Sequence, residues 1–101
     1  MKYKNPDLSI EERVKDLLGR MTLEEKVAQM DMIRGVELAE KVHSAHFCAV
    51  DEQADFQWDK VRESFGDRGM GFIHDVYSVP AVLNKVQRYL VEETRLGIPC
   101  I

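Results

Sequence analysis

Apolar residues recur at helical spacing along the first third of the chain. One stripe runs from residue 10 to 21 and a second from residue 23 to 33. Each follows a capping box, in which a hydroxyl and a glutamate three positions later satisfy the first free amides of a helix. These boxes are Ser9-x-x-Glu12 and Thr22-x-x-Glu25. We therefore predict a helical hairpin over residues 9–33, whose two apolar faces need something to pack against.

The middle of the chain is less regular. Residues 34–68 show no sustained period, and we predict an irregular segment or an insertion there. Near its end, Phe56, Trp58, Val61 and Phe65 predict a short amphipathic element that ends at Gly66.

The last third has the order strand, helix, strand. Residues 69–74 form a short apolar run introduced by glycines, which predicts a buried strand. Pro80 suits the first turn of a helix, and an apolar stripe continues to about residue 95. Gly97 and Pro99 end that helix, and Ile98 to Ile101 begin a second strand. Such a unit implies a parallel sheet with further strands, so we expect the chain to stop within a strand and to fold poorly alone.

The amino-acid composition limits which classes of function we expect for the chain. The 101 residues are 45% hydrophobic and 32% charged, with a net charge of −4, which fits a globular segment without an electrostatic footprint for nucleic acid. No stretch is long and apolar enough for a membrane span, and the N-terminus has no signal-like apolar core. Cys48 and Cys100 are unpatterned, which is typical of reduced thiols. We expect a cytoplasmic protein with no nucleic-acid or membrane partner.

His74 and Asp75 are the candidate binding residues. They follow the predicted strand 69–74 at its carboxyl end, the side on which parallel α/β folds build their sites. In a complete enzyme they would lie at the rim of a pocket. The alternative is structural: Asp75 braces the loop after the strand and His74 packs beside it.

The other groups of potentially reactive residues do not match the pattern of a known metal, cofactor or catalytic site. His43, His46 and Cys48 have no recognised zinc spacing and no fourth ligand, so we assign no metal. Gly69-x-Gly71 lacks the remaining glycine and the helix of a dinucleotide fingerprint, so we expect no cofactor. The adjacent pairs Glu11-Glu12 and Glu24-Glu25 fit the first turns of helices, where negative charge is favoured. The methionines at 30 and 32 are predicted to fill the core.

Two blocks of sequence carry a family resemblance. The first covers residues 8–30 and contains Arg20-Met-Thr-Leu-Glu-Glu-Lys-Val-Ala-Gln-Met30. The second covers residues 69–101 and contains Gly69-x-Gly71, Asn84-x-Val86-Gln87 and Glu92-x-Thr-Arg-Leu-Gly-Ile-Pro99. Together they resemble the N-terminal region of glycoside hydrolase family 3 enzymes of the β-glucosidase and β-xylosidase type. Residues 31–68 do not match.

The resemblance implies a fold and an activity. The fold would be α/β, an N-terminal fragment of a (β/α)8 TIM-type barrel: two leading helices, strand 1 at residues 69–74, helix 1, and the start of strand 2 at residue 98. Family members hydrolyse terminal β-O-glycosidic bonds in oligosaccharides or aryl glycosides by a retaining mechanism with two catalytic groups. Neither group falls within these 101 residues, so we assign no catalytic residue and expect the chain alone to be inactive, associating with the remainder of the barrel. The alternative is a small α-rich interaction or complementation module without catalysis.

Overall fold

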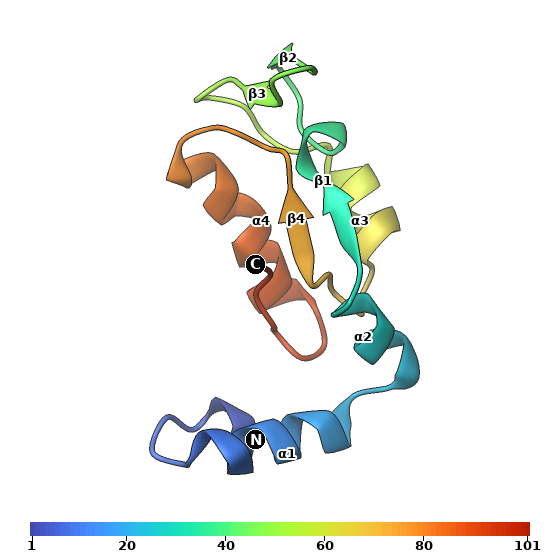
Figure 1. The fold of residues 1–101 in the computed structure, drawn as a ribbon, viewed down its shortest axis with the longest axis vertical. Helices are drawn as coiled ribbons and strands as arrows, with labels where there is room; N and C mark the ends of the chain where they lie inside the picture. Colours follow the sequence, from blue (N-terminus) through green and yellow to red (C-terminus); the bar gives the residue numbers. More distant parts are fainter.

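The computed structural model describes residues 1–101 as a small α/β fold (Figure 1). It contains four α-helices: α1 (Ile10–Arg20), α2 (Leu23–Ala28), α3 (Trp58–Phe65) and α4 (Pro80–Glu93). Its strands are β1 (Met32–Arg34), β2 (Val42–Ser44), β3 (Ala49–Val50) and β4 (Phe72–His74). Two short 3-10 helices, η1 (Lys2–Lys4) and η2 (Gly35–Glu37), complete it. None of the helices is long and apolar enough to cross a membrane.

The helix starts and stops follow the local sequence signals. Both capping boxes form: the Ser9 and Thr22 hydroxyls accept from the amides of Glu12 and Glu25, and each glutamate accepts from its cap residue's amide. Pro80 is the first residue of α4, and α3 ends at Gly66, which has a positive φ of 51°. The predicted helical hairpin over 9–33 is wrong in its extent, since α2 ends at Ala28 and α2 turns away from α1 (Figure 1).

Strand β1 was not expected from the sequence. It pairs in parallel with β4, with Met32 opposite Phe72, Ile33 opposite Ile73 and Arg34 opposite His74. The strand ending at His74 is therefore the second parallel strand of the chain. Met30 and Met32 are 77% and 58% exposed, so the prediction that they fill the core is also wrong.

Of the predicted strand–helix–strand unit, the structure contains the strand β4 and the helix α4, and residues 98–101 are not assigned to a strand. After α4 the chain returns to the free edge of β4, where the Ile101 amide donates to the Gly71 carbonyl over 2.9 Å. The Ile73 amide donates to the Ile101 carbonyl over 3.0 Å. This alternation is the bonding pattern of parallel strands, and it places residue 101 beside Phe72.

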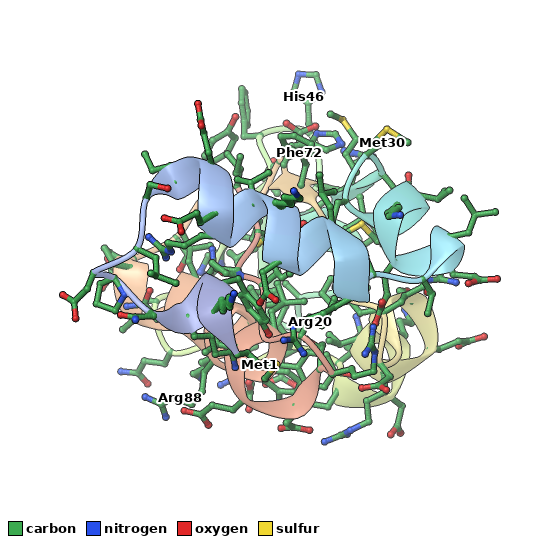
Figure 2. The ribbon with its side chains drawn as sticks, turned by 90° about the horizontal axis from the view of Figure 1, so that it is seen from below. Met1, Arg20, Met30, His46, Phe72 and Arg88 are labelled. Carbon is green, nitrogen blue, oxygen red and sulfur yellow. The ribbon has the colours of Figure 1, made fainter.

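Helices cover only one face of the parallel sheet. Ile33 and Ile73 pack against the apolar core, to which α3 and α4 contribute. The two helices lie together on this face, since the Tyr89 ring of α4 lies 6.3 Å from the Phe65 ring of α3. Because side chains alternate along a strand, the other face carries Met32, Arg34, Phe72 and His74, and we call it the open face. Figure 2 shows Phe72 and Met30 on the side of the strands opposite α4.

Residues 34–68, predicted to be irregular, have structure of their own. The expected amphipathic element is confirmed as α3, with Val61 and Phe65 fully buried. Before it, β2 and β3 pair as an antiparallel hairpin, which lies at the end of the molecule toward which β1 and β4 point (Figure 1). The hairpin is attached to the loop after β4 by hydrogen bonds from Tyr77 N to Cys48 O and from Val50 N to Tyr77 O.

An ion pair joins the start of α2 to the segment that follows α4. The Glu25 side chain, only 5% exposed, accepts from Arg95 at both carboxylate oxygens, with Nε to Oε1 at 2.7 Å. Arg95 also donates to the Arg20 carbonyl, at the end of α1, over 2.8 Å. The Arg95 guanidinium, followed by the hydrogen bond from the Thr22 amide, lowers the pKa of Glu25. The pair thus fixes the start of α2 against the segment that follows α4.

Helix α1 leaves its apolar stripe uncovered. It has no buried residue, and Ile10, Val14 and Leu18 are each about half exposed or more. The whole chain has an accessible surface of 6627 Å², against about 5,900 Å² for a folded chain of this mass. Its radius of gyration is 14.8 Å, against about 12.7 Å for a compact domain of this length. The expected lack of cover over the leading helices is confirmed.

Substituting Gly71 tests the close approach of β4 to the end of α2. A Cβ there would overlap the backbone carbonyl of Gln29, so Gly71→Ala is expected to lower the free energy of unfolding by about 3 kcal/mol. The control is Gly19→Ala within α1, where a Cβ meets nothing within 4 Å and should raise it by about 0.5–1 kcal/mol. Urea unfolding followed by circular dichroism measures both. Equal effects would contradict the packing described.

Acid titration tests the Glu25–Arg95 pair. Because the pKa of Glu25 is lowered in the folded chain, its stabilisation is present above the ordinary carboxyl pKa of about 4.3 and is lost as the pH falls through the lowered value. Glu25→Gln should remove this part of the dependence of unfolding free energy on pH between 7 and 3. Glu24→Gln is the control: Glu24 is exposed on the same helix, and the variant should keep the wild-type slope.

Candidate functional site

The carboxyl ends of β1 and β4 bring Arg34 and His74 together. The two residues are register partners, so their side chains leave the same face of the sheet, the open face. Gly35 permits the approach, because a Cβ there would lie 2.5 Å from Val76 Cγ1. Polar side chains at the end of a parallel sheet are thus set by backbone pairing and not by a flexible loop.

Asp75 connects these two side chains. Its Oδ2 lies 3.4 Å from His74 Nδ1 and 3.5 Å from Arg34 Nε. Its backbone has a positive φ of 53°, a left-handed conformation that aspartate adopts more readily than most residues. The Asp75 carbonyl also accepts from the Val36 amide over 3.1 Å, which continues the pairing beyond the strands. The predicted pair His74 and Asp75 therefore forms a direct contact, and Asp75 also braces the loop, as its structural alternative proposed.

Arg34 is the residue that the sequence interpretation missed. Its guanidinium lies 3.5 Å from a Glu37 carboxylate oxygen and 3.6 Å from the sulfur of buried Cys48. The interaction with Cys48, and then the charges of Glu37 and Asp75, raise the pKa of Arg34, so the group is a permanent cation. About half of the side chain remains exposed, which leaves donors free for a ligand. A sequence signal existed in the short apolar pair at 32–33, which is followed by Arg34 and then by Gly35.

A hollow of about 370 Å³ lies beside His74 and Asp75, between β4 and α4. Its floor is mostly apolar, and its rim includes Tyr77. The Gln87 amide closes one side by exchanging hydrogen bonds with the backbone of Cys100, at 2.8 and 3.1 Å. Burial raises the pKa of the Cys100 thiol, which keeps it protonated and unreactive. The hollow thus combines a mostly apolar lining with the polar groups of His74, Asp75 and Gln87.

The cluster of Arg34, His74 and Asp75 is better suited to binding a ligand than to transferring a proton. Its two carboxylates, Glu37 and Asp75, are both paired with Arg34. A retaining glycosidase needs one carboxylate free to attack and a second group free to donate a proton. Arg34, His74 and Asp75 instead offer hydrogen-bond donors and acceptors at the carboxyl ends of the strands, and His74 and Asp75 also line the hollow, which suits hydroxyl groups of a ligand.

The other side chains considered as metal ligands or catalytic carboxylates do not come together in the structure. His43 pairs with Asp51 at 3.2 Å, the His46 ring packs edge-on against Phe47, and Cys48 faces Arg34. No group of three or more metal-ligating side chains forms. Glu24 and Glu25 point in different directions, one to solvent and one to Arg95. Glu11 and Glu12 lie exposed in the first turn of α1.

Comparison with known proteins gives one informative relationship. The chain is 34% identical over 100 residues to a protein of Formosa agariphila named "Putative beta-xylosidase". The aligned region is 98% of this chain but only 13% of that protein. The chain thus spans about an eighth of the length of the curated relative that it matches. No protein-family model matches the chain.

Substitutions of Asp75 separate its backbone and side-chain roles. Asp75→Asn keeps a residue that tolerates a positive φ and removes two half-exposed ion pairs, so the free energy of unfolding should fall by less than about 1 kcal/mol. Asp75→Ala adds left-handed strain and should cost about 1–2 kcal/mol more. Urea unfolding of the three proteins measures the order. Identical values for the alanine and asparagine variants would show that the left-handed backbone carries no strain.

Proposed function

We propose that this chain is a scaffold segment of a glycoside hydrolase of family 3, a β-glycosidase that releases terminal sugars with retention. The observation that carries the proposal is the match of nearly the whole chain to one part of a much longer putative beta-xylosidase. The two sequence blocks that resemble the family also contribute one partner each to the Glu25–Arg95 pair. A structural contact between the blocks explains why both are needed in one chain.

The arrangement of the sheet supports a barrel wall. In a (β/α)8 barrel the helices lie outside the strands, and the inner face packs against the strands across the barrel. Here α3 and α4 lie on one face of β1 and β4, and the side chains of the open face are not part of the core. In this proposal β1, β4 and the strand beginning near Ile101 are consecutive strands of the barrel, and Arg34, His74 and Asp75 lie at its active-site end.

In this proposal the chain and the rest of the enzyme have different roles. The chain contributes binding groups at the strand ends, and the nucleophile and the acid/base belong to the rest of the enzyme. Substrates are β-linked oligosaccharides or aryl glycosides, with β-xylosides the first to test because of the relative's name. Alone, the chain lacks both catalytic groups that the reaction needs.

A second candidate function is a non-catalytic interaction or complementation module. The uncovered stripe on α1, on α2 and just after α2 favours it, because six large apolar side chains lie exposed there. The stripe consists of Ile10, Val14, Leu18, Leu23, Val27 and Met30. Recovery of a stable complex with an unrelated protein, together with an inactive chimaera in the experiment below, would favour this reading.

A chimaera tests the proposed function. In the Formosa agariphila protein, the matching segment is replaced by the aligned part of this chain. The chimaera should hydrolyse nitrophenyl β-xyloside, whereas deletion of the segment should abolish activity because the barrel loses its first strands. Arg95→Met in the chimaera should also reduce activity and thermal stability, since it leaves Glu25 buried without a partner at a cost of about 3–5 kcal/mol.

Three results would contradict the proposal. A folded chimaera without activity would show that the two segments are not equivalent. Full activity of the deletion protein would show that the segment is dispensable. Turnover by the purified 101-residue chain would show that the catalytic groups lie within it.

A further inference from the structure

Helix α1 and the end of α4 form the two walls of a groove, which we call the α1–α4 groove. Its apolar lining includes Ile10 and Val14 of α1, Val91 of α4 and Ile98 of the following segment, around a hollow of about 520 Å³. Ile10, Val14 and Val91 are 76%, 48% and 46% exposed. Figure 1 shows α1 below the strands, at the opposite end of the molecule from the hairpin of β2 and β3. The groove is therefore separate from the candidate site at the carboxyl ends of the strands.

Hydrogen bonds fix the two walls of the groove relative to each other. The hydroxyl of buried Tyr3 donates to the Leu96 carbonyl over 2.7 Å, directly before the segment 97–99. On the other side, the Tyr3 amide donates to Asp16 Oδ2 of α1 over 3.0 Å, and Arg13 Nε donates to the Tyr3 carbonyl over 3.0 Å. The groove is thus a surface between connected walls.

The flank of α4 that faces the groove also faces the edge of the parallel sheet. Gln87 lies one turn before Val91 and exchanges hydrogen bonds with the Cys100 backbone, at 2.8 and 3.1 Å. Tyr89, which packs against Phe65 of α3, lies about 200° around the helix from Gln87. One flank of α4 is therefore covered by α3, and the opposite flank, which carries Val91, has no helix beside it.

We propose that the α1–α4 groove binds the helix that follows the next strand of the proposed barrel. This inference rests on the proposed function and names the element that α1 contacts in it. At residue 101 the chain pairs with the free edge of β4, through hydrogen bonds with Gly71 and Ile73. Crossovers between parallel strands are right-handed, and the barrel adds its strands in order. The helix after a strand at this edge therefore lies on the same face as α3 and α4, beside α4 and away from α3.

The direction of that helix brings its C-terminal end to the groove. Helices between parallel strands run opposite to the strands, and the segment 97–99 lies at the amino ends of the strands. The charged side chains that line the groove are Lys4 and Arg13, both cationic, and no carboxylate lines it. Cations are favoured at the C-terminal end of a helix, where the backbone carbonyls carry partial negative charge. The shape and the charge of the groove thus fit the last turns of an amphipathic helix.

The same features disfavour other occupants. A symmetric dimer uses the same patch on both subunits, so a second copy of the chain would bring two cationic grooves together. A small polar ligand is disfavoured because most of the lining is apolar and the Tyr3 hydroxyl is already bonded to the Leu96 carbonyl. A helix with one apolar face would cover the side chains of both walls at once.

Photo-crosslinking in the chimaera tests which element occupies the groove. Ile10, at the groove, is replaced by p-benzoylphenylalanine, and the peptide that it labels on irradiation is identified by mass spectrometry. The crosslink should form within the same chain, to the first helix after the transplanted segment. The matched control carries the same group in place of Lys15, which is exposed and does not line the groove, and it should not label that helix.

A substitution in the same wall gives a second readout. Val14→Asn places an amide where the apolar contact is proposed, so thermal inactivation of the chimaera should be about tenfold faster. Val14 is about half exposed in this chain alone, so an effect of this size requires that another element covers it. Lys15→Asn is the control on the same helix and should change the inactivation rate less than about twofold.

These two experiments are independent of the test of the proposed function. Activity of the unsubstituted chimaera decides the proposed function, whereas the crosslink and the inactivation rates decide what covers the groove. In an active chimaera, a crosslink to a second chain, a crosslink to another part of the same chain, or no crosslink would overturn the inference and leave the proposed function in place. Equal inactivation rates of the two asparagine variants would overturn it as well. A folded chimaera without activity contradicts the proposed function even where the crosslink forms as expected.

Discussion

The contact between Glu25 and Arg95 holds the architecture together. A carboxylate that is almost fully buried is expensive to keep charged unless a cation is held in place beside it. Arg95 meets this need through two hydrogen bonds to the carboxylate, and its third goes to the last carbonyl of α1. Three segments are thereby joined: the end of α1, the start of α2 and the chain after α4. Glu25 also completes the Thr22 capping box, so one side chain sets both where α2 begins and what it lies against.

Local signals in the sequence were sufficient to place ends of α1, α3 and α4, but not the end of α2. A cap box, a proline at the first turn and a positive-φ glycine act within a few residues, and α1, α3 and α4 begin or end where those signals lie. Strand β1 could not be recognised this way, because three residues show neither alternation nor length. It exists because β4 lies beside it with matching amides, a partnership across about 40 positions that no local pattern encodes.

The candidate site also contains residues that local sequence signals indicate and residues that only tertiary pairing brings in. His74 and Asp75 were expected because they follow a strand that an apolar run predicts, whereas Arg34 joins them only through the register of β1 against β4. The hairpin was missed for a related reason, since β2 and β3 have two or three residues each and are stabilised by Cys48 and Val50 against the Tyr77 loop. Site residues that meet by tertiary pairing are the ones that sequence reasoning misses.

The two faces of the parallel sheet differ in how far their side chains are buried. The helix side of the parallel sheet is closed by Val61, Phe65, Val82 and Leu90, each at most 1% exposed. On the opposite face Met32 is exposed and Phe72 is partly buried, and the α1 stripe is exposed. Between α1 and the segment 97–99 lies a hollow of about 520 Å³. Tyr3 crosses this gap by donating its hydroxyl to the Leu96 carbonyl over 2.7 Å, so α1 is tethered at its base without being packed along its length. A parallel strand pair is ordinarily buried on both faces, and the less covered face here also carries the polar cluster. In the proposed barrel, this surface would pack against other strands along its length and leave room for a ligand at the carboxyl ends of the strands.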